Sequence, residues 1–249
     1  MGRFIPQVPP RCGPDLQLLE PLEGVLQELL EVDQRTYARS PMRCFGLEAR
    51  VVHFLTEGEG PIQGVNPRKI LIRPSVEPII FSYWNRFKKW SIDDDSVLSL
   101  AGCLCGREIK YRTSIAASLP NDIWESALYP SPDIAGNWLS SLPTPREDSQ
   151  ILEGLSAAFH VLASFVCYHP LEDGNGRVGR ALFQGALARC LGLSSPMLAV
   201  TPLVCFNAAA VIRGHRRLGA EGDWTEFVQA YHIILRDSLL YHKRVEEYL

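Results

Sequence analysis

The 249-residue chain lacks the features that mark membrane and secreted proteins. No apolar run approaches the ~20 residues that a membrane-spanning helix needs. The first residues, MGRFIPQVPPRCGPD, contain no apolar region of the kind found in secretory signals. Pro6 stands where the myristoylation pattern requires serine or threonine. We therefore expect a cytoplasmic protein without a membrane partner, with delivery into a host cell as an effector left open.

The chain also lacks an excess of basic charge and a pattern of cysteines. Its formal net charge is −3, so no nucleic-acid partner is expected. Seven cysteines are an odd number, and only Cys103 and Cys105 lie close together, at a spacing that does not suit a zinc site. The cysteines are therefore expected to be reduced thiols, mostly in the core.

Helical patterns dominate the rest of the chain, and 46% of its residues are hydrophobic, enough for a sizeable core. Residues 149–168 follow the helical i, i+3, i+4 spacing most clearly, with Asp148 or Ser149 as the expected cap. Pro21 should break the N-terminal helix early or lie in its first turn. Asp93–Asp95 should cap a helix and not bind a cation. Helices are expected over residues 16–40, 74–90, 91–104, 134–142, 149–168, 176–192, 202–219 and 223–249.

Four stretches depart from the helical pattern. Residues 1–14 are rich in proline and glycine and are expected to be irregular. Residues 69–74 suit a short strand or a buried turn. Within residues 106–118, Tyr111, Thr113 and Ile115 alternate with Arg112 and Ser114, which predicts a short strand or a hairpin arm. Residues 119–133, with three prolines, are expected to form a loop.

The stretch HPLEDGNGRVGR, residues 169–180, lies between two predicted helices and combines groups that bind phosphate. Gly174 and Gly176 permit positive φ and let the backbone approach a ligand closely. With Asn175 between them, successive N–H groups can form a concave nest for an anion. The nest opens the second helix, whose N-terminus attracts phosphate.

Charged side chains of the same stretch suit a polyphosphate. Arg177 and Arg180 are three residues apart and are expected to face the same side of the helix. Mg²⁺ takes one or two protein carboxylates together with phosphate oxygens, and Asp173, or alternatively Glu172, can supply one. His169 titrates near neutrality and can accept a proton from an attacking hydroxyl. Together these groups predict phosphoryl or nucleotidyl transfer.

This stretch resembles the motif of Fic-domain proteins, H-P-F-x-[D/E]-G-N-G-R-x-x-R. Leu171 is the one defined position that differs, and it keeps an apolar anchor under the turn. Residues 106–118 are similar to the segment that opens the target-positioning hairpin of that family, the flap. The resemblance implies an all-α fold, a Fic-type helical core with a small β-hairpin flap. We assign a helical extension to residues 1–95, the Fic domain to 96–235 and a C-terminal helix end to 236–249.

The resemblance also implies an activity: a protein adenylyltransferase, or AMPylator, which transfers AMP from ATP to a serine, threonine or tyrosine hydroxyl of a target protein. His169 would be the general base, and Asp173 would hold Mg²⁺. The phosphates of ATP would be bound by five residues, Gly174, Asn175, Gly176, Arg177 and Arg180. The flap would hold the target backbone as an added strand along Thr113, Ser114, Ile115 and Ala116.

The part of the family pattern that lines the base and ribose pocket is altered. Ile212 and Arg213 stand at the positions of a tyrosine pair, and Ala220 stands at an asparagine. The base therefore stays open, and UMP, phosphate or phosphocholine transfer and a non-catalytic Fic-fold binding module are the alternatives. Gly176 argues against the phosphorylating branch of the family, which lacks this glycine. The neighbouring residues 215–217 suit a solvated basic face slightly better than a nucleotide contact.

Regulation by a partner is a further expectation. The inhibitory pattern of the family, [S/T]-x-x-x-E-[G/N], is matched only by residues 149–154, at the start of the helix that leads to His169. We expect Glu153 to lie in the first turn of that helix and not to inhibit. The chain then either lacks self-inhibition or is restrained by a separate small antitoxin protein. A second copy of the chain is another candidate partner.

Overall fold

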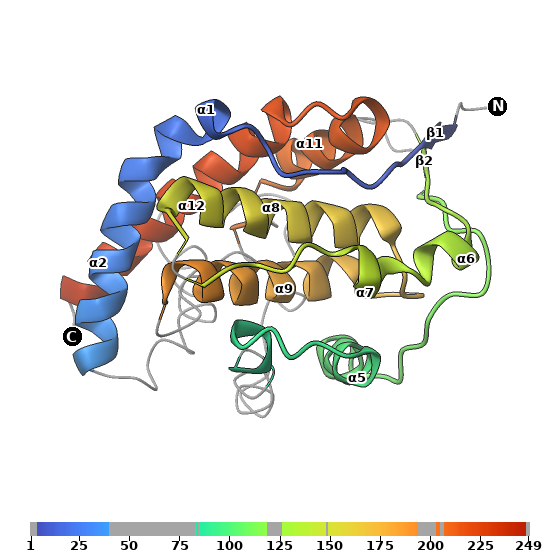
Figure 1. The fold of residues 1–249 in the computed structure, drawn as a ribbon, viewed down its shortest axis with the longest axis horizontal. Coiled ribbons are helices and arrows are strands. Elements are labelled where there is room, and N and C mark those ends of the chain that lie inside the picture. Colours follow the sequence, from blue (N-terminus) through green and yellow to red (C-terminus); the bar gives the residue numbers. More distant parts are fainter. Residues whose placement is uncertain are drawn as a thin grey trace, which may run out of the picture.

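The computed structural model describes residues 4–39, 83, 85–118, 126–147, 149–193, 203–204 and 207–247, and these are mostly helical (Figure 1). Helices α8 (Ile151–Tyr168) and α9 (Asn175–Leu191) lie side by side at the centre. Helix α5 (Asp94–Cys105) packs against α9, and α11 (Ala208–Glu221) packs against α12 (Thr225–Glu247), which also contacts α2 (Glu23–Arg39). The predicted helical fold is confirmed.

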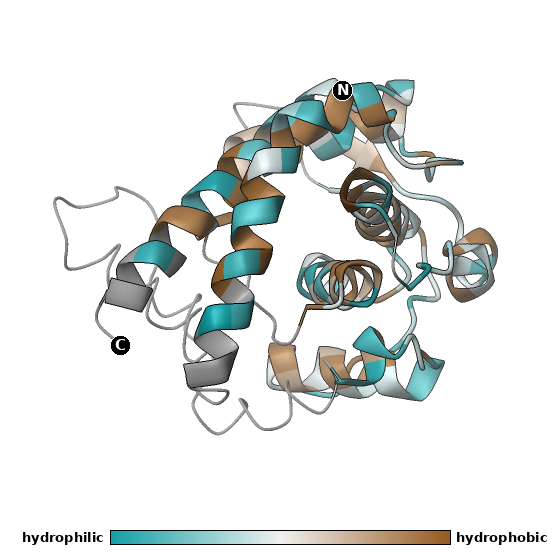
Figure 2. Ribbon diagram, turned by 60° about the vertical axis from the view of Figure 1, so that its left-hand side comes forward, coloured by the Kyte–Doolittle hydropathy of each residue, from teal (hydrophilic) through white to brown (hydrophobic). Residues whose placement is uncertain are grey.

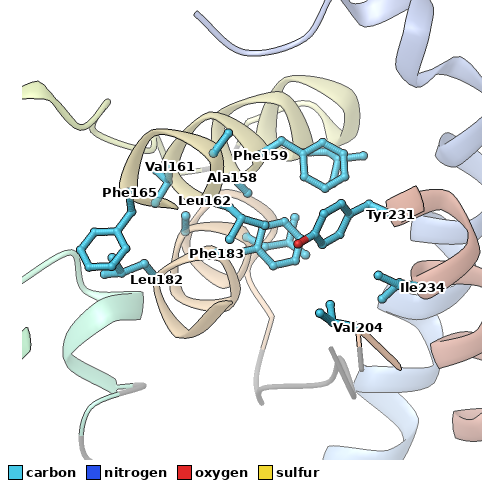
Figure 3. Packing of buried hydrophobic residues seen from close by; sticks show 14 of the residues in the cluster. Ala158, Phe159, Val161, Leu162, Phe165, Leu182, Phe183, Val204, Tyr231 and Ile234 are labelled. Carbon is cyan, nitrogen blue, oxygen red and sulfur yellow. The ribbon is translucent and has the colours of Figure 1, made fainter. Parts of the chain in front are cut away.

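Helix α8 is the centre of the hydrophobic core. The ring of Phe159 stacks on Phe183 of α9 at 5.5 Å between centroids and meets Phe227 of α12 edge-on at 5.3 Å. Tyr231 of α12 completes this aromatic group, and Figure 3 shows the rings of Phe159, Phe183 and Tyr231 close to one another. Figure 2 shows hydrophobic and hydrophilic residues alternating along the two long helices at the left, as expected of helices with one face on the core. The aromatic contacts therefore fix α8 against both α9 and α12.

Helix α8 is more apolar than expected, because no apolar run close to the length of a membrane-spanning helix was predicted. Among the described residues it is the one helix long and apolar enough to cross a membrane, with 18 residues of mean hydropathy 1.5. In this fold most of its apolar side chains are covered by neighbouring helices. A helix that is apolar on nearly all sides is also what the core of a helical domain requires.

Helix ends follow local signals in most places. Asp93 caps α5 as predicted, because its carboxylate accepts from the N–H of Ser96 at 2.7 Å. Gly192 ends α9 with φ of 65°, also as predicted. The cap predicted for α8 is wrong: Gln150 takes that position and makes no capping bond with its side chain. Ser149 instead donates its N–H to the end of α9, and Asp148 lies outside the described residues.

Proline and glycine divide the shorter helices. Helix α1 (Leu16–Leu19) is followed by a 3-10 turn, η1 (Glu20–Leu22), which contains Pro21, so the predicted early break is confirmed. The single helix predicted at residues 134–142 is two short ones, α6 (Pro132–Ala135) and α7 (Trp138–Ser141). Only residues 83 and 85–88 of the helix predicted at 74–90 are helical among those described there, and residues 69–74 lie outside the description.

Two predicted irregular segments contain strands. Strand β1 (Phe4–Pro6) pairs in parallel with β2 (Ser126–Leu128), so the predictions of irregular structure at 1–14 and a plain loop at 119–133 are wrong there. Pro6 is tolerated because it ends an edge strand, where a missing N–H costs little. On its other edge β2 meets Ala117 in antiparallel pairing.

This antiparallel pairing forms the base of the flap hairpin. The N–H of Ser118 donates to Ala127 and that of Tyr129 donates to Ala116, both at 3.0 Å. Residues 119–125, between the two arms, lie outside the description.

One hydrophobic cluster includes residues from Leu19 to Leu239 and so draws on all three regions assigned from the sequence. The boundaries between these regions stay a prediction. The thiols of the five described cysteines are free, and only Cys167 and Cys190 are buried, so the expectation of mostly core thiols fits just these two.

Candidate active site

The predicted site is a sharp turn between the two central helices. His169 ends α8 in the left-handed conformation (φ 50°, ψ 52°), and its N–H donates to the carbonyl of Phe165 at 3.0 Å. Gly174, also left-handed (φ 81°), precedes α9. A side chain at Gly174 would place its Cβ 2.9 Å from Sγ of Cys105, so both the backbone angle and the space require glycine. The turn thus brings the end of α8 next to the start of α9.

Asn175 holds this turn with its side chain. It is only 3% exposed, its Oδ1 accepts from the N–H of Leu171 at 2.9 Å, and its Nδ2 donates to the carbonyl of Leu171 at 2.8 Å. Leu171 is fully buried, so the apolar anchor expected at this position is present. The amide of Asn175 therefore bonds to the protein, and its backbone N–H is the group left to bind a ligand.

The start of α9 has the character of an anion site. The N–H groups of Asn175, Gly176 and Arg177 belong to its first turn, where no intrahelical acceptor exists. The side chain of Arg180 lies over Gly176, with Nη1 3.3 Å from where a Cβ would stand. Arg177 donates to the carbonyl of Leu104 at 2.7 Å, on the α5 side. The two arginines thus border the same helix start, and Arg177 is held against α5.

Asp173 is the candidate metal ligand. Its Oδ1 accepts from the N–H of Gly174 at 2.6 Å and from Arg177 at 3.1 Å, and its Oδ2 lies 3.4 Å from Arg107. Partial burial would raise the pKa of this carboxyl, but the Gly174 N–H and the two guanidinium groups outweigh burial and lower it. The group is therefore a carboxylate at neutral pH. The alternative ligand, Glu172, pairs with Arg107 at 2.9 Å.

A single ionised and partly exposed carboxylate fits Mg²⁺, which keeps most of its waters and takes phosphate oxygens as further ligands. No group of three or more potential metal ligands occurs in the described part of the chain, which argues against an all-protein metal cage there.

The imidazole of His169 is largely buried and uncharged. It stacks on the ring of Tyr129 at 4.0 Å between centroids, and none of the described residues gives its Nδ1 a hydrogen bond of normal geometry. Burial lowers the pKa of His169 to about 4; the backbone of Val166 opposes this shift, and the charges of Arg112 and Arg216 add to it. The ring is therefore neutral at pH 7, and Nε2 is the atom that it can offer to a substrate.

Arg112, which sequence reasoning did not assign to the site, links the flap to the turn. Its guanidinium is buried and donates to backbone carbonyls of Tyr168, His169, Ser114 and Pro130. Alternation along the chain predicted only its place on a strand. Nothing local in the sequence distinguishes a buried arginine from a solvated one. Tyr129 and Arg107 were also missed, because their contacts with His169, Glu172 and Asp173 join residues that are far apart in the chain.

The flap residues expected to hold a target form an exposed edge. Thr113, Ser114 and Ile115 are exposed, with Ile115 69% exposed, and Ala116 is half-buried. Their attachment beside the turn is direct, because the N–H of Arg112 donates to the carbonyl of Pro170 at 3.0 Å. The predicted flap residues and the predicted motif are thus neighbours.

The base-pocket candidates are on α11, where Ile212 is half-buried and both Arg213 and Ala220 are exposed. The α11 residue that reaches the site is Arg216, which donates to the hydroxyl of Ser118 in the flap arm. Sequence reasoning mentioned it only as part of a basic face.

The basic face expected at residues 215–217 is wrong for His215. Its ring lies edge-on to Phe227 at 4.8 Å, and burial lowers its pKa to about 3. Arg217 is exposed and forms ion pairs with acidic residues of the α11–α12 corner. Packing against α12 partly buries His215, a long-range effect that its polar neighbours concealed.

Glu153, the residue of the inhibitory pattern, is exposed in the first turn of α8. It is sixteen residues before His169, or about 24 Å along the helix. The expected helix-start position is confirmed.

Comparisons with known proteins agree with this geometry. Residues 102–187 match the model of the Fic/DOC family. Among solved structures 21 chains match, including a Fic family protein from Desulfovibrio desulfuricans G20 with a TM-score of 0.62 and 16% sequence identity. That match covers 95% of this chain and 77% of the other, and at such identity it shows the fold alone. No curated protein matches. The matched segment runs from α5 into α9 and includes the flap base and the turn, so this part of the chain is similar to the Fic/DOC family.

Proposed function

We propose that the chain is a Fic-type transferase that moves AMP from ATP to a serine, threonine or tyrosine hydroxyl of a target protein. The observation that carries this proposal is the convergence of three elements at one turn. These are the neutral ring of His169, the free N–H groups that start α9, and the exposed edge from Thr113 to Ala116. A base, an anion site and an edge for a peptide strand are the parts that transfer to a protein hydroxyl requires.

The surroundings of the turn suit a nucleoside triphosphate. The N–H groups of Gly176 and Arg177 would bind phosphate oxygens, with the guanidinium groups of Arg177 and Arg180 on either side. Asp173 would bind Mg²⁺, which would neutralise phosphate charge when present. Arg216 and Arg112 add positive charge close to His169. These four guanidinium groups around one turn give a positive local field in a chain of net charge −3.

In the proposed reaction the target hydroxyl oxygen attacks the α-phosphorus of ATP. The bond between that phosphorus and the oxygen bridging to the β-phosphate breaks, and pyrophosphate leaves with the electron pair. Nε2 of His169 accepts the hydroxyl proton. Stacking on Tyr129 fixes the plane of the ring, which favours a defined direction for that transfer. The phosphate charges near His169 would raise its pKa from the low value of the empty site and strengthen it as a base.

The exposed edge of the flap supports a protein as the acceptor. Segments that leave an extended, exposed backbone can receive a peptide as an added strand, which places one side chain of that peptide at a fixed depth. Here the edge ends beside His169, since the adjoining Arg112 bonds to His169 and Pro170.

The base of the nucleotide is the part with the least support. Arg213 and Ala220 are exposed and Ile212 is half-buried, in place of an enclosing tyrosine pair and an asparagine. This observation keeps UMP transfer, or transfer of another nucleotide, as the second candidate.

The test is label transfer to protein. Each α-labelled nucleoside triphosphate is supplied with Mg²⁺ to the wild type, His169→Ala and the matched control His160→Ala, in cell lysate and with the purified chain alone. His160 is on the same helix, bonded to the carbonyl of Pro10, and its loss should leave transfer unchanged. Label from ATP that disappears only with His169→Ala supports the proposal. Label from another nucleotide reassigns the base. No label with folded wild type in either setting refutes nucleotidyl transfer.

A further inference from the structure

The burial of Arg112 is not explained by the positive charge that it adds near His169. Only 8% of it is exposed, and the four side-chain hydrogen-bond partners described for it are backbone carbonyls, with no carboxylate among them. Burying a charge that lacks a counter-ion is costly unless hydrogen bonds compensate. Burial accordingly lowers the pKa of Arg112. The fold keeps the charge there against this cost, so its bonds must support a particular geometry.

Two of these bonds are made to the end of α8. Nε donates to the carbonyl of His169 at 2.5 Å, and Nη2 donates to that of Tyr168 at 3.2 Å. Carbonyls at a helix C-terminus lack intrahelical donors and carry partial negative charge. His169 also has a left-handed backbone, which is unfavourable for a residue with a Cβ. The guanidinium therefore fixes the backbone from which the imidazole projects.

The other two bonds are made to the flap. Nη1 donates to the carbonyl of Ser114 at 2.9 Å, and Nη2 also donates to that of Pro130. Ser114 precedes one arm of the hairpin, and Pro130 follows the other, whose bases pair through Ala116 and Tyr129. One side chain thus spans the hairpin base and attaches it to the residue that carries the imidazole.

We propose that Arg112 is a positioning residue that couples the flap edge to His169, so that a target strand bound along Thr113–Ile115 has a fixed distance and direction to the base. This inference rests on the proposed function for its catalytic part. The coupling itself is a property of the fold. A lysine cannot replace Arg112, because three donors on one nitrogen cannot reach carbonyls on both sides of a planar fork.

The experiment compares the full-length wild type with Arg112→Met, Arg112→Lys and Arg189→Met. Arg189 is the matched control: its half-buried guanidinium donates to the carbonyls of Pro145 at 2.9 Å and Lys89 at 3.0 Å, away from the turn. Two quantities are measured. The first is the rate of label transfer from α-labelled ATP over a range of ATP concentrations. The second is amide hydrogen exchange in residues 113–118 and 168–172.

For Arg112→Met we expect the maximal transfer rate to fall about 100-fold, because small misplacements of reacting groups have effects of that size. The ATP concentration at half-maximal rate should change less than about threefold, because phosphate binding is retained. Amide hydrogen exchange should become faster in both measured segments, residues 113–118 and 168–172. Arg112→Lys should recover less than about a tenth of the lost rate, because charge alone does not restore the geometry. Arg189→Met should show none of these effects.

An unchanged maximal rate, or a rate loss explained wholly by weaker ATP binding, would overturn the positioning role. Faster exchange in only one of the two segments would overturn the coupling. If Arg112→Met does not fold, Arg112→Lys and Arg112→Gln decide by the same criteria. If the wild type transfers no label, the proposed function fails, but hydrogen exchange still decides the coupling because it needs no substrate.

Discussion

Replacement of Asn175 tests whether this residue of the phosphate motif acts on the fold or on the ligand. Asn175→Ala removes two hydrogen bonds, of 2.9 Å and 2.8 Å, and leaves both backbone groups of the buried Leu171 without those partners. A buried polar group left unsatisfied costs roughly 1–3 kcal/mol. Some relaxation and water entry will recover part of this. We expect the free energy of unfolding to fall by about 3 kcal/mol, a large part of the roughly 5–15 kcal/mol of a typical domain.

Asn175→Asp separates the two bonds. The carboxylate can still accept from the N–H of Leu171, but it has no donor for the carbonyl and repels it. This loss should cost roughly 1–3 kcal/mol. A negative charge at the start of α9 gains only about 0.3–1 kcal/mol from the helix dipole, so the variant should still be destabilised.

Urea unfolding at pH 7, followed by far-UV circular dichroism, measures both variants. Asn137→Ala is the control, because Asn137 is exposed and its Nδ2 donates to one carbonyl at 3.2 Å. It should cost less than about 0.5 kcal/mol. An Asn175→Ala protein that is as stable as the control but no longer binds nucleotide would refute the reasoning, since the side chain would then be a ligand.

Three further predictions follow from the turn and the flap. Gly192→Ala should lower the free energy of unfolding by about 1 kcal/mol, because its φ is positive, and should leave activity unchanged. Gly174→Ala should lower it by about 1 kcal/mol more, because Cys105 must move, and should abolish transfer. Equal losses of stability and of activity in the two variants would contradict this. The pKa of His169 is lowered from 6.5 to about 4, so the unfolded chain binds more protons between these values and the stability from His169 is lost as pH falls from about 6.5 to about 4. His169→Gln should remove roughly 3 kcal/mol of this dependence in urea titrations at several pH values, and an unchanged profile would count against the burial of the ring. Ile115→Pro, which removes a flap N–H, should abolish transfer to protein while nucleotide binding persists, and Ile115→Ala, which keeps that N–H, should remain active; similar activity of the two would exclude an added strand.

The features predictable from the sequence were those set by neighbouring residues. Gly192 and the cap at Asp93 act within one helical turn, so their effects can be read from a few positions. The central helix α8 was clear because its apolar residues repeat with the helical period over five turns. Gly174 belongs to the same class, since it has the positive φ that its residue type allows, whereas Gly176 is already part of helix α9 and does not use that freedom.

The features that were missed depend on residues far apart in the chain. Strand β1 finds its partner 122 residues later, and a three-residue segment ending in proline has no local pattern to show that. Arg112 bonds to carbonyls 56 and 57 residues away, at the end of α8. His215 packs against α12, with its Nε2 at 3.3 Å from the hydroxyl of Tyr231, sixteen residues on. In each case tertiary packing, and not propensity, decides the environment of the residue.

The same distinction explains how an acidic chain could have the proposed site for a polyanion. Composition excluded a basic surface, and the net charge of −3 agrees with that. Yet the charges of Arg112 and Arg216 act together on His169, and of the charged side chains that shift its pKa only Asp173 opposes them. Burial, with a smaller contribution from the two arginine charges, lowers the pKa of His169 and keeps the imidazole neutral before the nucleotide binds, so the base does not have to lose a proton first. In the proposed reaction the triphosphate would cancel the local positive field, and the affinity of His169 for the hydroxyl proton would rise when the substrate is in place. Placement of a few arginines around one turn, and not their number in the chain, is therefore what the proposed chemistry would depend on.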